Sequence, residues 1–174
     1  MKLYRKIQET RSLSASDIVI VLDESTSITT QAFESAKKSC EMILEYYDKP
    51  DNRFSVVFFS TTSRIISPWS SNRVEVAQTI RGNILCYLIL KLRSEAYQQG
   101  GTTEMVAALT KARDLFQLTE DRLSRTKRPR LVFLITDGYP STDPTAIAQT
   151  LKWDSVRSKR IFIVNSYHRE PHCL

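Results

Sequence analysis

The sequence predicts an α/β fold: a doubly wound, mostly parallel central sheet with helices on both faces. Four short runs rich in Val, Ile and Phe are apolar at almost every position, and they cover residues 18–22, 54–59, 131–135 and 161–164. Continuous apolar character over this length is typical of strands that are covered on both faces. Helical patterns lie between the runs, and strands that alternate with helices predict a parallel sheet.

The helical patterns are stripes of apolar residues at three- and four-residue steps. The first stripe follows Thr29 and Thr30, either of which can cap the helix, and comprises Phe33, Ala36, Cys40, Ile43 and Tyr47. The second stripe comprises Met105, Leu109, Ala112 and Phe116. Asp143 followed by Pro144 predicts the start of a third helix. Residues 64–69 (RIISPW) are expected to form an edge strand that pairs with residues 54–59.

Composition limits the function classes. A chain of 174 residues with 41% hydrophobic side chains is long enough for one core but short for two domains. The net charge of +6 permits contact with anionic partners, yet no zinc-finger spacing or RNA-binding aromatic box supports nucleic acid. The three cysteines form no CxxC pair, which argues against a zinc site and a disulfide scaffold. No apolar run is long enough to span a membrane.

The expected organisation is an N-terminal extension over residues 1–16, one domain over residues 17–166 and an irregular tail over residues 167–174. An apolar stretch at residues 82–92 (GNILCYLILKL) interrupts the domain pattern. We interpret it as an extra buried helix, a partner surface or the product of a misassembled gene model.

Two carboxylates stand directly after predicted strands. Asp23 follows residues 18–22, and Asp137 follows residues 131–135 and Thr136. Ligands of doubly wound sheets bind at the carboxyl ends of the strands, beside the point where the strand order reverses. We therefore expect both carboxylates at the same edge of the sheet.

Three segments supply oxygen ligands: residues 23–27 (DESTS), 100–103 (GGTT) and 136–138 (TDG). They contain carboxylates and hydroxyls without a thiolate or imidazole, which selects a hard cation such as Mg²⁺ or Mn²⁺. In an extended turn, alternate residues point the same way, so Asp23, Ser25 and Ser27 are expected to converge. Each segment alone also fits an ordinary Asx turn or hairpin turn, and only their combination predicts a metal site.

The chain has DESTS after a predicted strand, GGTT before a predicted helix and TDG after another predicted strand. Together and in this order, the three motifs resemble the von Willebrand factor type A domain and its metal-ion-dependent adhesion site. The resemblance runs from residue 17 to residue 164. It implies that Ser25 and Ser27 bind the metal directly. It also implies that Thr103 and the carboxylates of Asp23 and Asp137 reach the metal directly or through water.

The choice of Thr103 over Thr102 depends on the helix that follows. Residues 104–109 (EMVAAL) then have the register that the family's helix has after its threonine.

The resemblance implies a binding module rather than an enzyme, without catalytic residues. By this resemblance, a divalent cation at the site is expected to capture an Asp or Glu carboxylate of a protein partner. The domain is then expected to act at the cell surface or in the extracellular matrix, as part of a longer protein. An intracellular scaffold is the first alternative, since no signal peptide or glycosylation sequon is evident. A magnesium-dependent phosphohydrolase is the second, although such enzymes use a second aspartate where this chain has Ser25.

The chain departs from the family pattern in two places. The family has glycines at the positions of Glu24 and Thr26, and we expect the charge of Glu24 to weaken the capture of an acidic partner. The resemblance also implies another strand and a final helix after residue 164, which we expect to be missing.

Basic residues precede the predicted strands, at the edge opposite the predicted metal site. This edge is either an ordinary solvated surface or, as a hypothesis, a surface that holds sulfated glycans or anionic lipids. It comprises Arg5, Lys6, Arg11, Arg53, Lys127, Arg128, Arg130, Arg157, Lys159 and Arg160.

Overall fold

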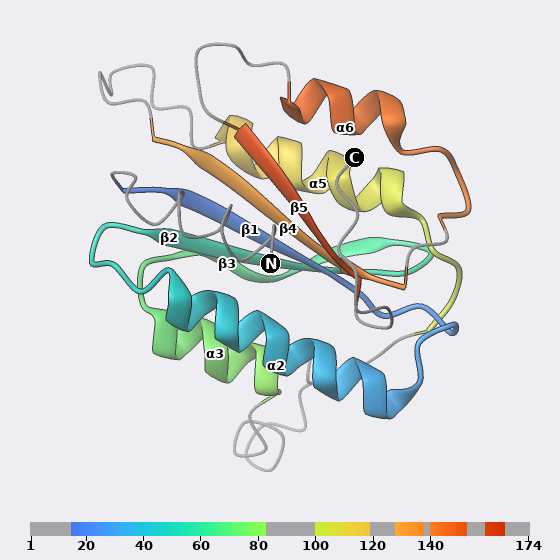
Figure 1. Cartoon of the computed structure of the whole chain (residues 1–174), viewed down its shortest axis with the longest axis horizontal. Helices are drawn as coiled ribbons and strands as arrows, with labels where there is room; N and C mark the ends of the chain where they lie inside the picture. The colour runs from blue at the N-terminus through green and yellow to red at the C-terminus, as the bar shows by residue number, and fades with distance from the viewer. Residues whose placement is uncertain (1–14, 83–99, 119–127, 138–139, 153–158, 166–174) are drawn as a thin grey trace.

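The computed structural model describes residues 15–82, 100–118, 128–137, 140–152 and 159–165 (Figure 1). Three predicted features lie largely or wholly outside these residues: the N-terminal extension, the apolar stretch at 82–92 and the tail at 167–174.

The described strands form one five-stranded sheet in the order β3-β2-β1-β4-β5. The strands are β1 (Asp17–Asp23), β2 (Arg53–Phe59), β3 (Ser63–Ser70), β4 (Arg130–Thr136) and β5 (Lys159–Asn165). All neighbouring pairs are parallel except β2 and β3, which are antiparallel. The predicted mostly parallel sheet and the predicted edge strand are both confirmed.

Among the described residues, helices cover both faces of the sheet (Figure 1). The helices α2 (Thr30–Tyr46) and α3 (Arg73–Arg81) lie on one face, and α5 (Met105–Leu118) and α6 (Thr145–Lys152) lie on the other. None of the helices in the described ranges is long and apolar enough to cross a membrane.

The sheet has an apolar core on each face, and alternate residues of β1 belong to opposite cores. Ile18, Ile20 and Leu22 pack in the core beneath α2 and α3. Val19 and Val21 pack in the core beneath α5 and α6. All five side chains are inaccessible to solvent. Burial on both faces is the physical reason for the uninterrupted apolar sequence of this strand.

Side-chain caps fix the helix starts. The hydroxyl of Thr29 accepts a hydrogen bond from the backbone N–H of Ala32 at the start of α2. The carboxylate of Asp143 accepts one from the N–H of Thr145, the first residue of α6. Asn72 caps α3 in the same way through the N–H of Glu75.

Replacing Asn72 by Ala is expected to lower the free energy of unfolding by about 1 kcal/mol, because the N–H of Glu75 loses its side-chain partner. Urea denaturation measures the change. Gln78→Ala is the control, since Gln78 is exposed to solvent and lies away from the first turn of the same helix. Equal stability of the Asn72 variant and the wild type would show that the cap does not stabilise α3.

The structure describes the side chains of Arg53, Arg128 and Arg130 from the predicted basic edge, and the side chains of its other members lie outside the described residues. Arg53 donates two hydrogen bonds to the buried carboxylate of Asp17, at 2.8 and 2.9 Å, and Arg128 forms an ion pair with the same carboxylate at 2.8 Å. Arg130 is buried and donates to the backbone carbonyl of Phe116 at 3.0 Å. The assignment of Arg130 to a basic surface is therefore wrong, because its guanidinium belongs to the domain interior.

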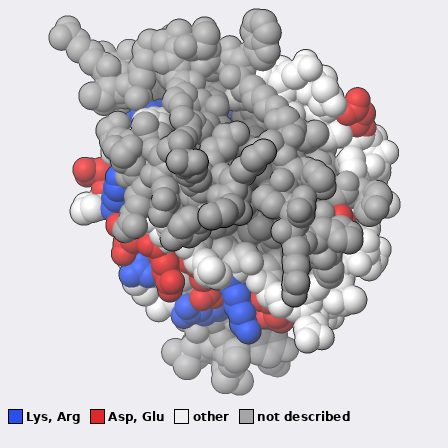
Figure 2. Space-filling model, viewed as in Figure 1, with Lys and Arg blue, Asp and Glu red and all other residues white. Residues whose placement is uncertain are grey.

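The face covered by α2 and α3 carries charges of both signs. Figure 2 shows basic and acidic side chains side by side on the part of this face that the structure describes. Arg81 of α3 forms an ion pair with Glu41 of α2 at 2.5 Å, and Arg73 of α3 forms one with Asp48, which follows α2, at 2.9 Å. The part of this surface that the structure describes therefore carries paired charges of both signs.

Candidate metal centre

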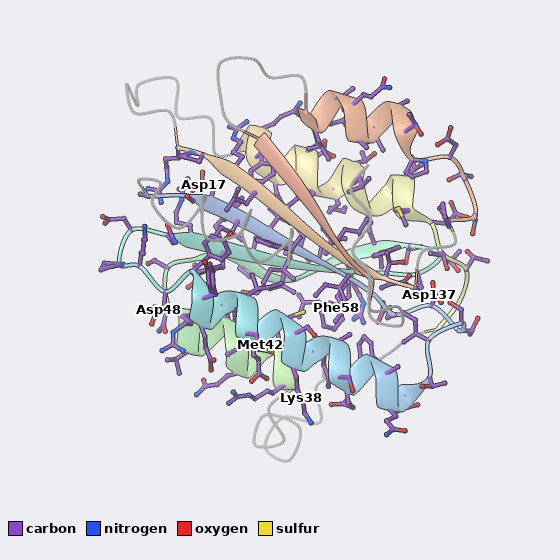
Figure 3. The ribbon with its side chains drawn as sticks, viewed as in Figure 1. Asp17, Lys38, Met42, Asp48, Phe58 and Asp137 are labelled. Carbon is purple, nitrogen blue, oxygen red and sulfur yellow. The ribbon has the colours of Figure 1, made fainter. Side chains whose placement is uncertain are left out.

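The candidate site lies at the carboxyl ends of β1 and β4. These strands are parallel neighbours with Leu22 opposite Ile135, so Asp23 and Thr136 emerge side by side. Within the sheet, β2 lies next to β1 on one side and β4 lies next to it on the other. The strand order therefore reverses direction at β1. This is the point at which ligands bind in such sheets. Figure 3 shows Asp137 at this edge and Asp17 at the opposite edge.

Asp23 is fully buried at the end of β1. One carboxylate oxygen accepts a hydrogen bond from the N–H of Ser25 at 2.9 Å, and the other accepts one from the hydroxyl of Thr136 at 2.7 Å. Burial raises the pKa of Asp23 above its ordinary value, the hydrogen bonds oppose this shift, and the nearby charge of Asp137 adds to it. A positive ion beside Asp23 would therefore relieve an unfavourable buried charge.

The hydroxyl oxygens of Ser25 and Ser27 lie 2.9 Å apart. Ser25 is buried, whereas Ser27 is exposed at the rim of the site. Adjacent ligands in an octahedron of metal–oxygen distances near 2.0 to 2.1 Å are separated by about 2.9 Å. In the structure the two hydroxyls form a hydrogen bond with each other, and the same separation is compatible with neighbouring ligands of a Mg²⁺ ion.

The Gly100–Gly101 segment packs closely against the DESTS loop. The N–H of Gly100 donates to the carbonyl of Glu24 at 3.1 Å, and the carbonyl of Gly101 accepts from both the N–H and the hydroxyl of Thr26 at 3.0 Å. Both glycines have positive φ angles, +71° and +108°. A Cβ atom on Gly101 would lie 2.4 Å from the hydroxyl oxygen of Thr61. Glycine at this position permits the close approach of the loops.

The two threonines of the GGTT segment have different surroundings. Thr102 is exposed, and its N–H and hydroxyl both bond to the hydroxyl of Thr61, at 3.0 and 3.2 Å. Thr103 is buried, and its backbone exchanges two hydrogen bonds with Ser141, at 2.9 and 3.2 Å. The hydroxyl of Thr102 is held by the β2–β3 turn, which favours Thr103 as the ligand.

Asp137 follows β4 and is partly exposed. Its Oδ1 atom is buried, and no hydrogen-bond donor among the described residues reaches it. Buried carboxylate oxygens are normally paired, so this atom fits a site that a cation completes. Within the described ranges no three His, Cys, Asp or Glu side chains gather as a metal cluster. A cation here would therefore depend on hydroxyl ligands as well as on the two aspartates.

Glu24 is buried beside the site, and its charge is paired with that of an arginine. Its carboxylate is 1% exposed and accepts two hydrogen bonds from Arg64 of β3, at 2.6 and 3.2 Å. The alternation along the DESTS loop directs Glu24 away from Asp23 and Ser25, and the guanidinium of Arg64 neutralises its charge. The structure therefore shows no exposed charge of Glu24 to support the expected repulsion of acidic partners, and that expectation stays untested.

The sequence did not reveal roles for Thr136 and Ser141. The hydroxyl of Thr136 donates to Asp23, and Ser141 joins the segment after β4 to the backbone of Thr103. Thr136 belongs to the TDG motif, and this position could have indicated its role beside Asp23. Ser141 lies in a polar segment whose sequence is like that of an ordinary loop, so no pattern indicated its role.

Comparison with known proteins agrees with the resemblance. Residues 17–167 match the family model of the von Willebrand factor type A domain. The chain is 28% identical over 152 residues to "Sushi, von Willebrand factor type A, EGF and pentraxin domain-containing protein 1" of Mus musculus, covering 84% of this chain and 4% of that protein. It is 25% identical over 144 residues to the collagen alpha-4(VI) chain of Mus musculus, covering 82% of this chain and 6% of that protein. The chain thus corresponds to a small part of these relatives.

Among solved structures, the fold resembles proximal thread matrix protein 1 from the mussel byssus, with a TM-score of 0.68 and 19% identity over 85% of this chain and 36% of that chain. A second structure of that mussel protein, described as having a zinc-occupied MIDAS motif, matches with a TM-score of 0.66 and 19% identity, covering 86% of this chain and 37% of that chain. These likenesses support the fold. The family match over residues 17–167 establishes that the chain belongs to the von Willebrand factor type A domain family.

Proposed function

We propose that this domain binds a divalent cation, Mg²⁺ or Mn²⁺, and uses it to capture a carboxylate of a protein partner. The observation that carries the proposal is the buried Oδ1 atom of Asp137, to which the described residues donate no hydrogen bond, at the edge where Asp23 also emerges. The oxygen-rich ligand set favours a hard cation. The zinc-occupied motif described for the mussel protein supports a divalent-cation site in a similar fold.

In this proposal, Ser25 and Ser27 bind the cation directly. Thr103 and the carboxylates of Asp23 and Asp137 bind it directly or through water. The two aspartates balance the charge of a divalent ion, and the hydroxyls add no charge. When bound, the cation supplies an electrophilic position for one acidic side chain of the partner.

Binding is favoured over catalysis by the composition of the site. Ser25 stands where a magnesium-dependent phosphohydrolase would need a second aspartate, and it is buried beside Ser27. We propose that the domain is a binding module and not an enzyme. Magnesium-dependent turnover of p-nitrophenyl phosphate that is lost in an Asp23 variant would instead favour the phosphohydrolase.

An extracellular place is proposed from the names of the similar proteins. One is a collagen chain and another is a thread matrix protein of the mussel byssus. Adhesion within a matrix is the corresponding role. An intracellular assembly scaffold is the alternative, and the location of the full-length protein in cells distinguishes the two.

Selection of peptides from a random library on the immobilised domain tests carboxylate capture. In Mg²⁺ the selected peptides are expected to contain a required Asp or Glu, whose replacement by Asn or Gln abolishes binding. A chelator is expected to release them, and the Asp137→Asn variant is expected to select none. Asp48→Asn is the matched control, because Asp48 lies at the opposite edge of the sheet (Figure 3). Peptides that stay bound in chelator would contradict the proposal.

A further inference from the structure

Glu24 and Arg64 form a buried ion pair beside the candidate metal centre. Arg64 Nη2 lies 2.6 Å from one oxygen of Glu24, and Nε lies 3.2 Å from the other. The Glu24 side chain is 1% exposed and that of Arg64 is 21% exposed. The guanidinium also lies over the ring of Phe58, 5.7 Å from its centroid. Two-point hydrogen bonding of this kind fixes the orientation of both side chains.

The backbone of Glu24 is held at two further points. Its N–H donates to the carbonyl of Phe59 at the end of β2, at 2.8 Å, and its carbonyl accepts from the N–H of Gly100 at 3.1 Å. Glu24 thus joins the DESTS loop to the end of β2, to the glycine segment and, through Arg64, to β3. It stands between Asp23 and Ser25, both of which belong to the candidate metal centre.

We propose that Glu24 and Arg64 are a positioning pair, which holds the DESTS loop so that Asp23, Ser25 and Ser27 face one cation. This inference rests on the proposed cation site. Because the pair is neutral, the charge available to the cation remains that of Asp23 and Asp137. The carboxylate of Glu24 therefore serves the site through geometry and not as a ligand.

The Arg64→Ala variant separates geometry from charge. If the pair positions the ligands, the variant is expected to bind Mg²⁺ about 10-fold more weakly than the wild type does. This is the lower end of the loss that follows when residues that orient metal ligands are removed. If only charge mattered, the variant would bind Mg²⁺ more tightly than the wild type, because removing a guanidinium near the site leaves more negative charge for the cation. Calorimetric titration with MgCl₂ at pH 7 measures the affinity. Tighter or unchanged binding would overturn the proposal.

The Arg64→Lys variant retains the charge and loses the two-point geometry. Its affinity is expected to fall between those of the wild type and Arg64→Ala, at about threefold weaker than wild type. If Arg64→Ala fails to fold, this variant decides alone, and wild-type affinity would overturn the proposal. Unfolding of each metal-free variant by urea is measured in parallel, so that loss of affinity is compared with loss of stability.

Arg81→Ala is the matched control. Arg81 also makes two hydrogen bonds to one carboxylate, that of Glu41, but on the surface between α2 and α3. Its removal is expected to leave Mg²⁺ affinity unchanged. If the wild type itself binds no Mg²⁺ saturably, the proposed function fails. If the wild type binds and both Arg64 variants bind equally well, only the positioning role fails.

Discussion

Replacing Asp23 by Asn is expected to abolish saturable Mg²⁺ binding while the metal-free domain stays at least as stable as the wild type at pH 7. Both oxygens of Asp23 accept hydrogen bonds, from the N–H of Ser25 and the hydroxyl of Thr136. An amide keeps these contacts, because its oxygen still accepts from Ser25 and its NH₂ group can donate to the rotated hydroxyl of Thr136. What the variant loses is the negative charge.

The direction of the pKa shift sets the sign of the stability change. Burial raises the pKa of Asp23 above the ordinary value of 3.8, so the folded state holds its proton more tightly than the unfolded state. The metal-free wild type therefore loses stability as the pH rises from 3.8 through the raised folded pKa. The Asn variant has no carboxyl group to ionise, so it does not lose stability in this way. At pH values above the folded pKa of Asp23, its stability is expected to equal or exceed that of the wild type.

Calorimetric titration with Mg²⁺ tests the expected loss of binding, and urea denaturation between pH 4 and pH 8 tests the expected change in stability. Affinity is expected to fall by at least about 100-fold, more than the loss of an outer-shell partner costs. Asp143→Asn is the control, because hydrogen bonds from Thr145 lower the pKa of that exposed carboxyl and its removal is not expected to stabilise the fold at pH 7. Wild-type Mg²⁺ affinity in the Asp23 variant would contradict the assignment of this residue.

Replacing Gly101 by Ala is expected to damage both the fold and the site. The φ angle of +108° is strained for any residue with a side chain, and the new Cβ would lie 2.4 Å from the hydroxyl oxygen of Thr61. That oxygen accepts hydrogen bonds from the N–H and hydroxyl of Thr102, so it cannot move without breaking them. We expect a loss of about 1 to 3 kcal/mol of unfolding free energy.

The same substitution is expected to weaken Mg²⁺ binding, because Gly101 holds Thr26 of the DESTS loop through two hydrogen bonds. Gly82→Ala is the matched control. Gly82 also has a positive φ angle, +67°, but it ends α3 away from the site. The control is expected to lose stability without losing Mg²⁺ affinity. Equal affinity in both variants would show that the close approach at Gly101 does not shape the site.

The fold could be predicted because burial dictates sequence directly. The strands β1 and β4 are covered on both faces, so nearly all their residues are apolar and each run is recognisable alone. The proximity of the Ser25 and Ser27 hydroxyls was also predictable, since it follows from alternation within one short segment.

The contacts of Glu24 and Arg130 could not be predicted, because they depend on pairings between distant segments. Glu24 meets Arg64 because β3 pairs with β2 in a register that sets Arg64 opposite Phe58, and this register contains irregular steps near Val56. Arg130 precedes an apolar strand like any surface residue, yet its guanidinium reaches the carbonyl of Phe116 in α5. Neither register nor helix packing is encoded in a local pattern.

The choice between Thr102 and Thr103 was made from helix register, and the structure adds a reason of a different kind. Thr102 bonds to Thr61 in the turn between β2 and β3, whereas Thr103 is tied to Ser141 after β4. The sequence separates these partners by about 40 positions, so their proximity becomes visible only in the folded chain.

We propose that oxygen atoms from three loops, which lie far apart in the sequence, surround one cation. Anomalous diffraction from crystals grown with MnCl₂ tests it most directly. We expect one strong manganese peak about 2 Å from the hydroxyl oxygens of Ser25 and Ser27, with Thr103 and the carboxylates of Asp23 and Asp137 around it. A peak elsewhere on the domain, or no peak at millimolar manganese, would contradict the account.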